Sequence, residues 1–209
     1  MAKEFWTSDL HLNHKGILEY TDRGRYLTMG RNPNPEDAGP PVTIEEHNKW
    51  VVDVINAHVG ERDRLYFLGD MMIGANKWVA AYWISQINCM HKELVFGNHD
   101  DEHREFYATS GLFESVQDRI TMKLNKKMII MDHFPIVEWN AGHHSSWMLH
   151  GHSHGNFDYA KANLHDKRIL DVGFDNSVKV LGHYAPFEFA DIEKYMEGRI
   201  SIDHHGKAD

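Results

Sequence analysis

Three short apolar segments in the first hundred residues, each followed by a polar loop, constrain the fold most strongly. Phe5–Ser8 runs into Asp9, Leu65–Leu68 into Gly69-Asp70, and Leu94–Phe96 into Gly97-Asn98-His99-Asp100. Between them, Thr43 and Glu46 form a capping-box signature for one helix, and residues 76–88 are typical of a second. Alternation of strands and helices predicts an α/β fold, with polar loops gathered at the carboxyl ends of the strands.

The second half of the chain contains more strands and fewer helices. Strand-like segments cover residues 120–124, 127–131, 147–150 and 169–172, with a hairpin turn at Asn125-Lys126 and a late helix over 187–196. This pattern predicts a four-layer α/β/β/α sandwich of two mixed β-sheets flanked by helices, with a metal site at the strand-end loops. Residues 29–41 hold four of the six prolines and are predicted to form an exposed loop.

Length and charge limit the classes of protein to which the chain can belong. Its 209 residues fit one domain over residues 1–209, with a loose tail after about residue 202. A net charge of −9 argues against strong general binding of nucleic acid. The single cysteine, Cys89, suits a reducing cytoplasm, and no apolar run approaches the roughly 18 residues of a membrane span. We therefore expect a cytoplasmic protein with no membrane partner, and leave its oligomeric state open.

Side chains that commonly bind metals follow five of the predicted strands. The five segments are Asp9-Leu10-His11, Gly69-Asp70, Gly97-Asn98-His99-Asp100, Asp132-His133 and Gly151-His152-Ser153-His154. Alternate side chains of an extended segment share a face, so each Asp-x-His or His-x-His pair is expected to converge. The glycines permit tight turns and close backbone approach. Two aspartates, one asparagine and four histidines suit Mn²⁺, Fe, Zn²⁺ or Co²⁺ better than Mg²⁺ or Ca²⁺.

The order of these five motifs resembles the calcineurin-like metallophosphoesterase superfamily, from about Phe5 to His154. The opening stretch is similar to the small stand-alone members from bacteria and their phages. The resemblance implies two divalent metal ions, Mn first, with Fe, Zn, Co, Ni or Mg as alternatives. It makes Asp9, His11 and His154 ligands of the first ion, Asp70 the bridge, and Asn98, His133 and His152 ligands of the second. A carboxylate suits the bridge because it has two oxygens, one for each ion.

The resemblance also assigns roles beyond the metal ligands. His99 matches the position that contacts phosphate and protonates the leaving group, and Asp100 is expected to hold the His99 ring through its other nitrogen. The residues that we expect to contact substrate are His14, Lys15, Arg23, Arg25, His143 and His144. For these six residues, solvated surface loops are the alternative interpretation.

The expected function is a dinuclear metal-dependent phosphoester hydrolase in which metal-bound hydroxide attacks phosphorus directly. A phosphodiesterase on a small or nucleotide substrate is the first choice, because the chain is short and acidic. A phosphomonoesterase or protein phosphatase is the nearest alternative, and a metal-binding interaction scaffold without catalysis is the alternative from another class. We interpret Trp78, Tyr82 and Trp83 as helix packing and His204-His205 as part of the tail.

Overall fold

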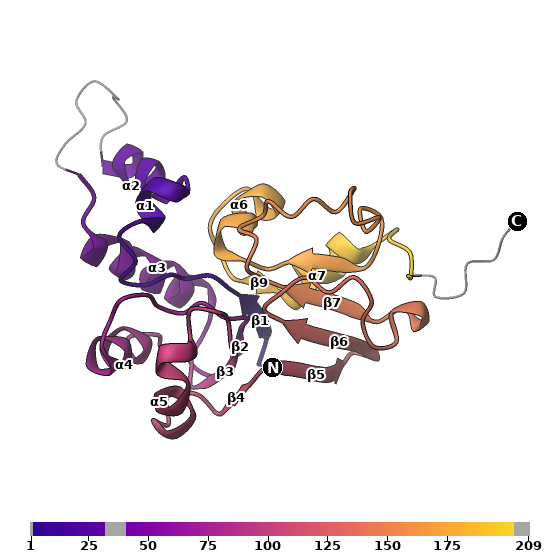
Figure 1. Cartoon of the computed structure of the whole chain (residues 1–209), viewed down its shortest axis with the longest axis horizontal. Coiled ribbons are helices and arrows are strands. Elements are labelled where there is room, and N and C mark those ends of the chain that lie inside the picture. Colours follow the sequence, from indigo (N-terminus) through magenta and orange to yellow (C-terminus); the bar gives the residue numbers. More distant parts are fainter. Residues whose placement is uncertain (1, 32–40, 203–209) are drawn as a thin grey trace, which may run out of the picture.

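Two mixed β-sheets form the centre of the computed structural model, which describes residues 2–31 and 41–202 (Figure 1). The larger sheet has the order β4-β3-β2-β1-β9, and the smaller has the order β5-β6-β7-β8. The strands are β1 (Glu4–Thr7), β2 (Arg64–Phe67), β3 (His91–Val95), β4 (Ser115–Gln117), β5 (Arg119–Leu124), β6 (Lys127–Asp132), β7 (Trp147–His150), β8 (Ile169–Asp171) and β9 (Phe187–Glu188). Strands β1 to β4 are parallel, and β6 to β8 are parallel, whereas β9 and β5 pair antiparallel to their neighbours.

Helices connect the strands and flank the sheets. They are α1 (Ile17–Tyr20), α2 (Arg23–Arg31), α3 (Ile44–His58), α4 (Lys77–Ser85), η2 (Asp101–His103), α5 (Arg104–Thr109), η3 (Gly142–His144), α6 (Phe174–Leu181) and α7 (Phe189–Met196). The predicted capping box is present, because the Thr43 hydroxyl accepts the Glu46 N–H and the Glu46 carboxylate accepts the Thr43 N–H. The predicted helix over 187–196 is wrong at its start: residues 187 and 188 pair with β1 as β9, and α7 follows.

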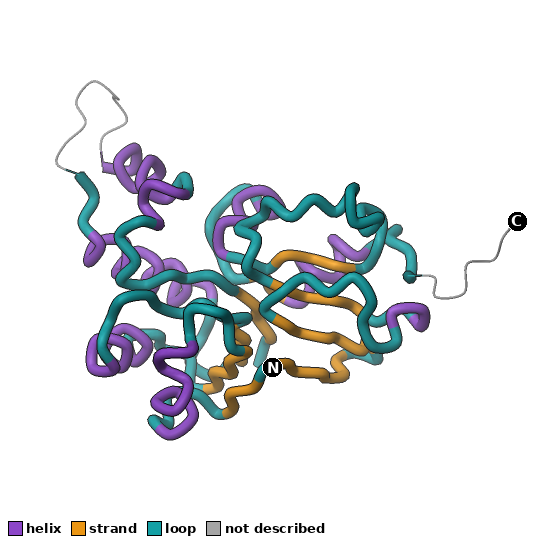
Figure 2. The backbone as a smooth tube through the Cα atoms, viewed as in Figure 1, coloured by secondary structure: helices purple, strands orange, loops and turns teal. Residues whose placement is uncertain are grey.

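Alternating side chains divide the core into layers. Leu65 and Phe67 of β2 face the helices on the outer side of the larger sheet, whereas Tyr66 faces the smaller sheet. Ile129 and Met131 of β6 pack in the inter-sheet core. The outer face of the smaller sheet is covered in part by long connections, which contribute Trp139 and Leu164, and by the segment after α7, which contributes Ile202 (Figure 2). Two sheets packed face to face therefore fix where the strand-end loops meet.

Some expectations fall partly or wholly outside the described residues. The predicted loop over 29–41 is helical at residues 29–31, where α2 ends, and residues 32–40 are not described. The tail after residue 202, including His204 and His205, also lies outside the described part. Among the helices of residues 2–31 and 41–202, none combines the length and apolarity needed to cross a membrane.

Candidate metal centre

The candidate ligands meet at the carboxyl ends of β1, β2, β3, β6 and β7. Two groups of three side chains each bring one ligand atom per residue within 4.8 Å of the others. The first group is Asp9, His11 and His154, and the second is Asp70, His133 and His152. The seventh candidate, Asn98, joins the second group, because its Oδ1 lies 3.0 Å from His133 Nε2. All seven residues are thus gathered into two adjoining clusters.

Left-handed backbone, rather than strand alternation, makes the side chains converge. Asp9, His11, Asp70, His152 and His154 all have φ between 49° and 67°. The expectation that both pairs converge on extended segments is therefore wrong in its reason: Asp9 and His11 do join one group, whereas His152 and His154 divide between the two groups. Non-glycine residues in this region each cost about 1–3 kcal/mol, and such strain is typical of functional sites.

Close backbone approach at two glycines brings the loops together. A Cβ on Gly151 would lie 1.9 Å from Ser8 Oγ and 2.6 Å from Asp9 Oδ2. A Cβ on Gly97 would lie 2.2 Å from Asp70 Oδ1. Both distances are far below van der Waals contact, so any larger residue would push a ligand loop out of place.

Asp70 lies between the two groups and faces both with one oxygen. Its Oδ2 is 3.6 Å from His11 Nε2 and 3.5 Å from His133 Nε2. Its Oδ1 instead accepts the backbone N–H of His99 at 2.9 Å. Oδ2 is therefore the oxygen placed to serve both groups, and the bridging role of Asp70 stays a prediction.

The first group contains a histidine whose nitrogens have no protein partner. His11 is 4% exposed, yet neither of its ring nitrogens makes a hydrogen bond within the described residues. Burial is the main cause that lowers the His11 pKa, so the ring is neutral and presents a lone pair. Buried polar atoms without a partner are costly, and a metal ion would supply that partner. The donor set therefore fits a divalent cation.

Other residues orient the ligand histidines. His154 Nδ1 lies 2.6 Å from Asp175 Oδ2, and His133 Nδ1 lies 2.7 Å from the carbonyl of Leu68. Each partner accepts the Nδ1 proton, which leaves Nε2 free to bind a metal. With its lone pair directed at Asn98 Oδ1, His133 Nε2 forms an acceptor–acceptor contact that a cation between them would relieve.

Asp100 holds backbone rather than the His99 ring. Its two oxygens accept the N–H groups of Asp70, Met71 and Gly97 at 2.8, 3.0 and 2.8 Å. Burial raises the pKa of Asp100 to about 7, and either protonation state keeps lone pairs for the three donors. The expectation that Asp100 orients the ring is wrong, because the buried carboxylate links the Gly69 and Gly97 loops instead. His99 is 45% exposed in its side chain and lies 4.0 Å from Asp70 Oδ2.

Arg23 is buried, so its expected contact with substrate is also wrong. Its guanidinium donates to both oxygens of Asp175, to the carbonyls of Asp9 and Leu10, and to His47 Nε2. These contacts use all five N–H donors of an arginine, which leaves none for a phosphate. The side chain is 0% exposed and packs over the Phe174 ring.

The remaining candidates for substrate contact divide into two sets. His14 lies at the centre, with its ring 5.4 Å from that of His11, whereas Lys15 and Arg25 are exposed on α1 and α2 or beside them. Their contact with substrate stays a prediction. His143 and His144 lie on η3 before the start of β7, whereas His152 follows its end. Their place at the far end of the strand contradicts the expectation that they line the cleft.

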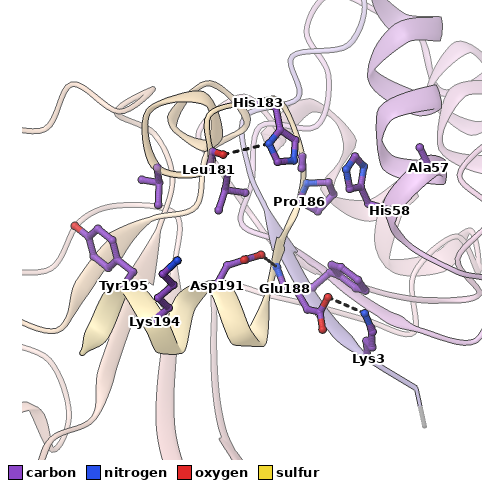
Figure 3. A pocket seen from close by; sticks show the side chains of 13 residues that line it. Lys3, Ala57, His58, Leu181, His183, Pro186, Glu188, Asp191, Lys194 and Tyr195 are labelled. Atoms are coloured by element: carbon purple, nitrogen blue, oxygen red, sulfur yellow. Dashed lines mark hydrogen bonds and ion pairs between the residues drawn. The ribbon is translucent and has the colours of Figure 1, made fainter. Parts of the chain in front are cut away.

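Two cavities differ in their relation to the centre. One of 380 Å³ adjoins the first group, with His154, Asp175 and Tyr20 in its wall. Another, of 650 Å³, lies beside the start of β1 between β9, α7 and the end of α3, where Lys3 pairs with Glu188 (Figure 3). Because the candidate ligands follow the end of β1, the larger cavity is separate from them.

Sequence reasoning missed residues that support the ligands and misjudged two aromatics. Asp175 orients His154, and Asp171 accepts the N–H of Gly155, the residue after His154. The sequence signal that could have found these two aspartates was the same as for the other loops: both lie at or just after the strand-like segment 169–172.

Trp78 and Tyr82 are 72% and 57% exposed, so they are not packed as expected. Trp83 does pack in part against the core.

Comparison with known proteins gives distant relatives along most of the chain. No protein-family model matches. The gene 66 protein of Mycobacterium phage L5 is 25% identical over 201 residues, covering 84% of this chain and 87% of that protein. The uncharacterized protein MJ1445 of Methanocaldococcus jannaschii is 27% identical over 201 residues, covering 94% of this chain and 93% of that protein. The protein of unknown function AQ665 from Aquifex aeolicus has a TM-score of 0.63 at 18% identity, covering 93% of this chain and 100% of that one.

The comparison with AQ665 shows that the two chains share a fold. The predicted α/β fold of two mixed sheets flanked by helices is confirmed. The two ligand groups and the layered fold agree with the expected resemblance to the calcineurin-like metallophosphoesterase superfamily, and membership of that superfamily stays a prediction.

Proposed function

We propose that the chain is a dinuclear metal-dependent phosphoester hydrolase. One observation carries the proposal: two groups of ligand atoms adjoin at a single oxygen, Asp70 Oδ2, and the buried His11 of the first group makes no hydrogen bond through either ring nitrogen within the described residues. Asp9, His11 and His154 would hold one ion, and His133, His152 and Asn98 the other, with Asp70 shared. Manganese is the first choice for both.

Two divalent cations bound there would activate the attacking water and neutralise charge on the phosphoryl oxygens. The residues around them keep the ligands in place. The His99 N–H fixes Asp70 Oδ1, which leaves Oδ2 directed between the two groups. Asp175 and the Leu68 carbonyl hold the Nδ1 protons of His154 and His133, so that Nε2 of each ring can bind metal.

His99 is the proposed proton donor to the leaving group. Its ring stands beside Asp70 and is accessible to solvent, whereas His11 and His133 are buried among the candidate ligands. A histidine that is not held by a metal can carry a proton near neutral pH and pass it to a departing alkoxide. Asp100 acts on His99 only through the backbone of the loop they share.

A small or nucleotide phosphodiester is the proposed substrate class. The cavity of 380 Å³ beside His154 supports this choice, because it offers room for a modest leaving group next to the first ligand group. The net charge of −9 supports it too, since long nucleic acid would be repelled. A cytoplasmic location stays a prediction.

The test is an assay of protein loaded with Mn²⁺, Zn²⁺, Fe²⁺ or Mg²⁺ on bis-p-nitrophenyl phosphate and on p-nitrophenyl phosphate. We expect hydrolysis that chelator abolishes and Mn²⁺ restores, with the diester preferred. A preference for the monoester would identify a phosphatase instead. Two bound ions with no turnover of either ester would point to a binding scaffold and contradict the proposal.

A further inference from the structure

Arg23 of α2 is a buried cation connected to every member of the first ligand group. It donates to the carbonyl of Asp9 at 2.6 Å and to that of Leu10, next to His11, at 2.7 Å. Two further bonds of 2.8 Å join it to Asp175, whose Oδ2 also accepts the Nδ1 proton of His154. The guanidinium therefore reaches Asp9 through one hydrogen bond, His11 through the Leu10 carbonyl that precedes it, and His154 through Asp175.

The second ligand group is held by other residues. Asp100 accepts the backbone N–H of Asp70, and the Leu68 carbonyl accepts the Nδ1 proton of His133. Arg23 makes no hydrogen bond to either ligand within the described residues. The groups do touch, since His152 N–H donates to both Asp9 carboxylate oxygens and His11 N–H donates to the Asp70 carbonyl, but among the described residues the hydrogen bonds of Arg23 to ligand segments go to the first group.

We infer that Arg23 is a positioning residue that sets the affinity of the first metal site and leaves the second nearly unaffected. This inference rests on the proposed function only for the presence of the metals. The left-handed segment around Asp9 and His11 is held at its carbonyls by the two Nη atoms, and the planar fork fixes Asp175 against His154. Loss of such outer partners usually lowers metal affinity by about 10–100-fold.

The geometry of arginine, rather than its charge alone, is required. All five N–H groups are used, the fifth by His47 Nε2 at 3.3 Å. Lysine has three donors on one atom and cannot span Asp175 and two carbonyls at once. Arg23→Lys therefore keeps the charge while breaking the network. Asp175→Asn attacks the same network from its other end, and Arg62→Lys, at an exposed arginine, is the matched control.

Manganese binding to the metal-free protein tests this inference. Calorimetry should give two sites for the unchanged protein and for Arg62→Lys. In Arg23→Lys and Asp175→Asn the first site should weaken by about 10–100-fold, with the second within a few-fold of its original value. Electron paramagnetic resonance at one to two equivalents of Mn²⁺ should then show isolated ions in place of a coupled pair.

Two results would overturn the inference. In one, Arg23→Lys binds both ions as the unchanged protein does. In the other, both sites weaken equally together with a fall in the urea midpoint, which would mean that Arg23 only stabilises the fold. If Arg23→Lys fails to fold, Asp175→Asn decides between the same outcomes. An unchanged protein that binds two ions without hydrolysing either ester would contradict the proposed function alone, whereas one that binds no manganese would contradict both.

Discussion

Replacement of Asp100 by alanine should destabilise the metal-free protein, because this carboxylate is the buried acceptor of three backbone N–H groups. The donors belong to Asp70, Met71 and Gly97, at 2.8, 3.0 and 2.8 Å, and Asp100 is 0% exposed. Alanine would leave all three donors without a partner. A buried donor without an acceptor costs about 1–3 kcal/mol. We expect a loss of about 3–5 kcal/mol, at the low end of the sum because water can enter the vacated space.

Urea unfolding in the presence of chelator measures this loss. For a chain of this length the slope is about 2–3 kcal/mol per molar urea, so the midpoint should fall by about 1–2 M. Asp101→Ala is the matched control, since the neighbouring Asp101 side chain is 73% exposed and pairs with the partly exposed Arg104. It should shift the unfolding free energy by less than about 0.5 kcal/mol.

An Asp100→Ala protein with the same urea midpoint as Asp101→Ala would contradict the role of Asp100 as a structural acceptor. If that protein also lost turnover with its metal content intact, Asp100 would act on the His99 proton after all. Asp100→Asn gives an intermediate check, because its one remaining carbonyl oxygen can serve some of the three donors. Its loss should fall between those of the other two variants.

Three further predictions concern the metals, the proton and pH. Asp70→Ala should reduce the binding of both ions in elemental analysis, whereas His11→Ala should chiefly reduce the first; equal losses in the two variants would argue against a shared Asp70. His99→Ala should keep its metals and lose roughly 10²–10⁴-fold in turnover of an alkyl ester, but less with a nitrophenyl ester, and equal losses would indicate phosphate binding instead. Burial and Arg23 lower the pKa of His47 to about 3. Below about pH 6.5 the unfolded chain therefore takes up a proton that the folded protein excludes, so the free energy of unfolding decreases as the pH is lowered. From pH 7 to pH 4.5 the free energy of unfolding should fall by about 2–3 kcal/mol through His47 alone. Urea unfolding at these two pH values should show that this loss is absent from His47→Gln, and an identical pH dependence in both proteins would contradict the role of His47.

The sequence predicted best those elements whose signals are local. Thr43 and Glu46 formed the expected capping box, and Asn125-Lys126 formed the expected turn, with both residues at positive φ. Short elements without such signals were missed, including β4 and α6, because tertiary pairing and packing decide them. The start of the predicted final helix became β9 for the same reason, since pairing with β1 outweighs local preference.

The sequence predicted which residues gather at the site, but it did not predict the hydrogen-bond partner of each side chain. Strand-end positions identified all seven candidate ligands, because parallel strands bring their carboxyl ends to the same edge within each of the two sheets. Whether Arg23 faces solvent or Asp175, 152 residues away, depends on how α2 packs, and nothing near Arg23 in the sequence states it. The same holds for Asp100, whose N–H donors lie partly on another loop.

A crystal structure with manganese, with the ions located by anomalous scattering, tests the central claim most directly. We predict two ions roughly 3.5–4 Å apart, both bound by Asp70 Oδ2. Asp9, His11 and His154 should complete one site, and Asn98, His133 and His152 the other. A single ion, or a ligand drawn from His143 in place of one of these seven, would contradict it.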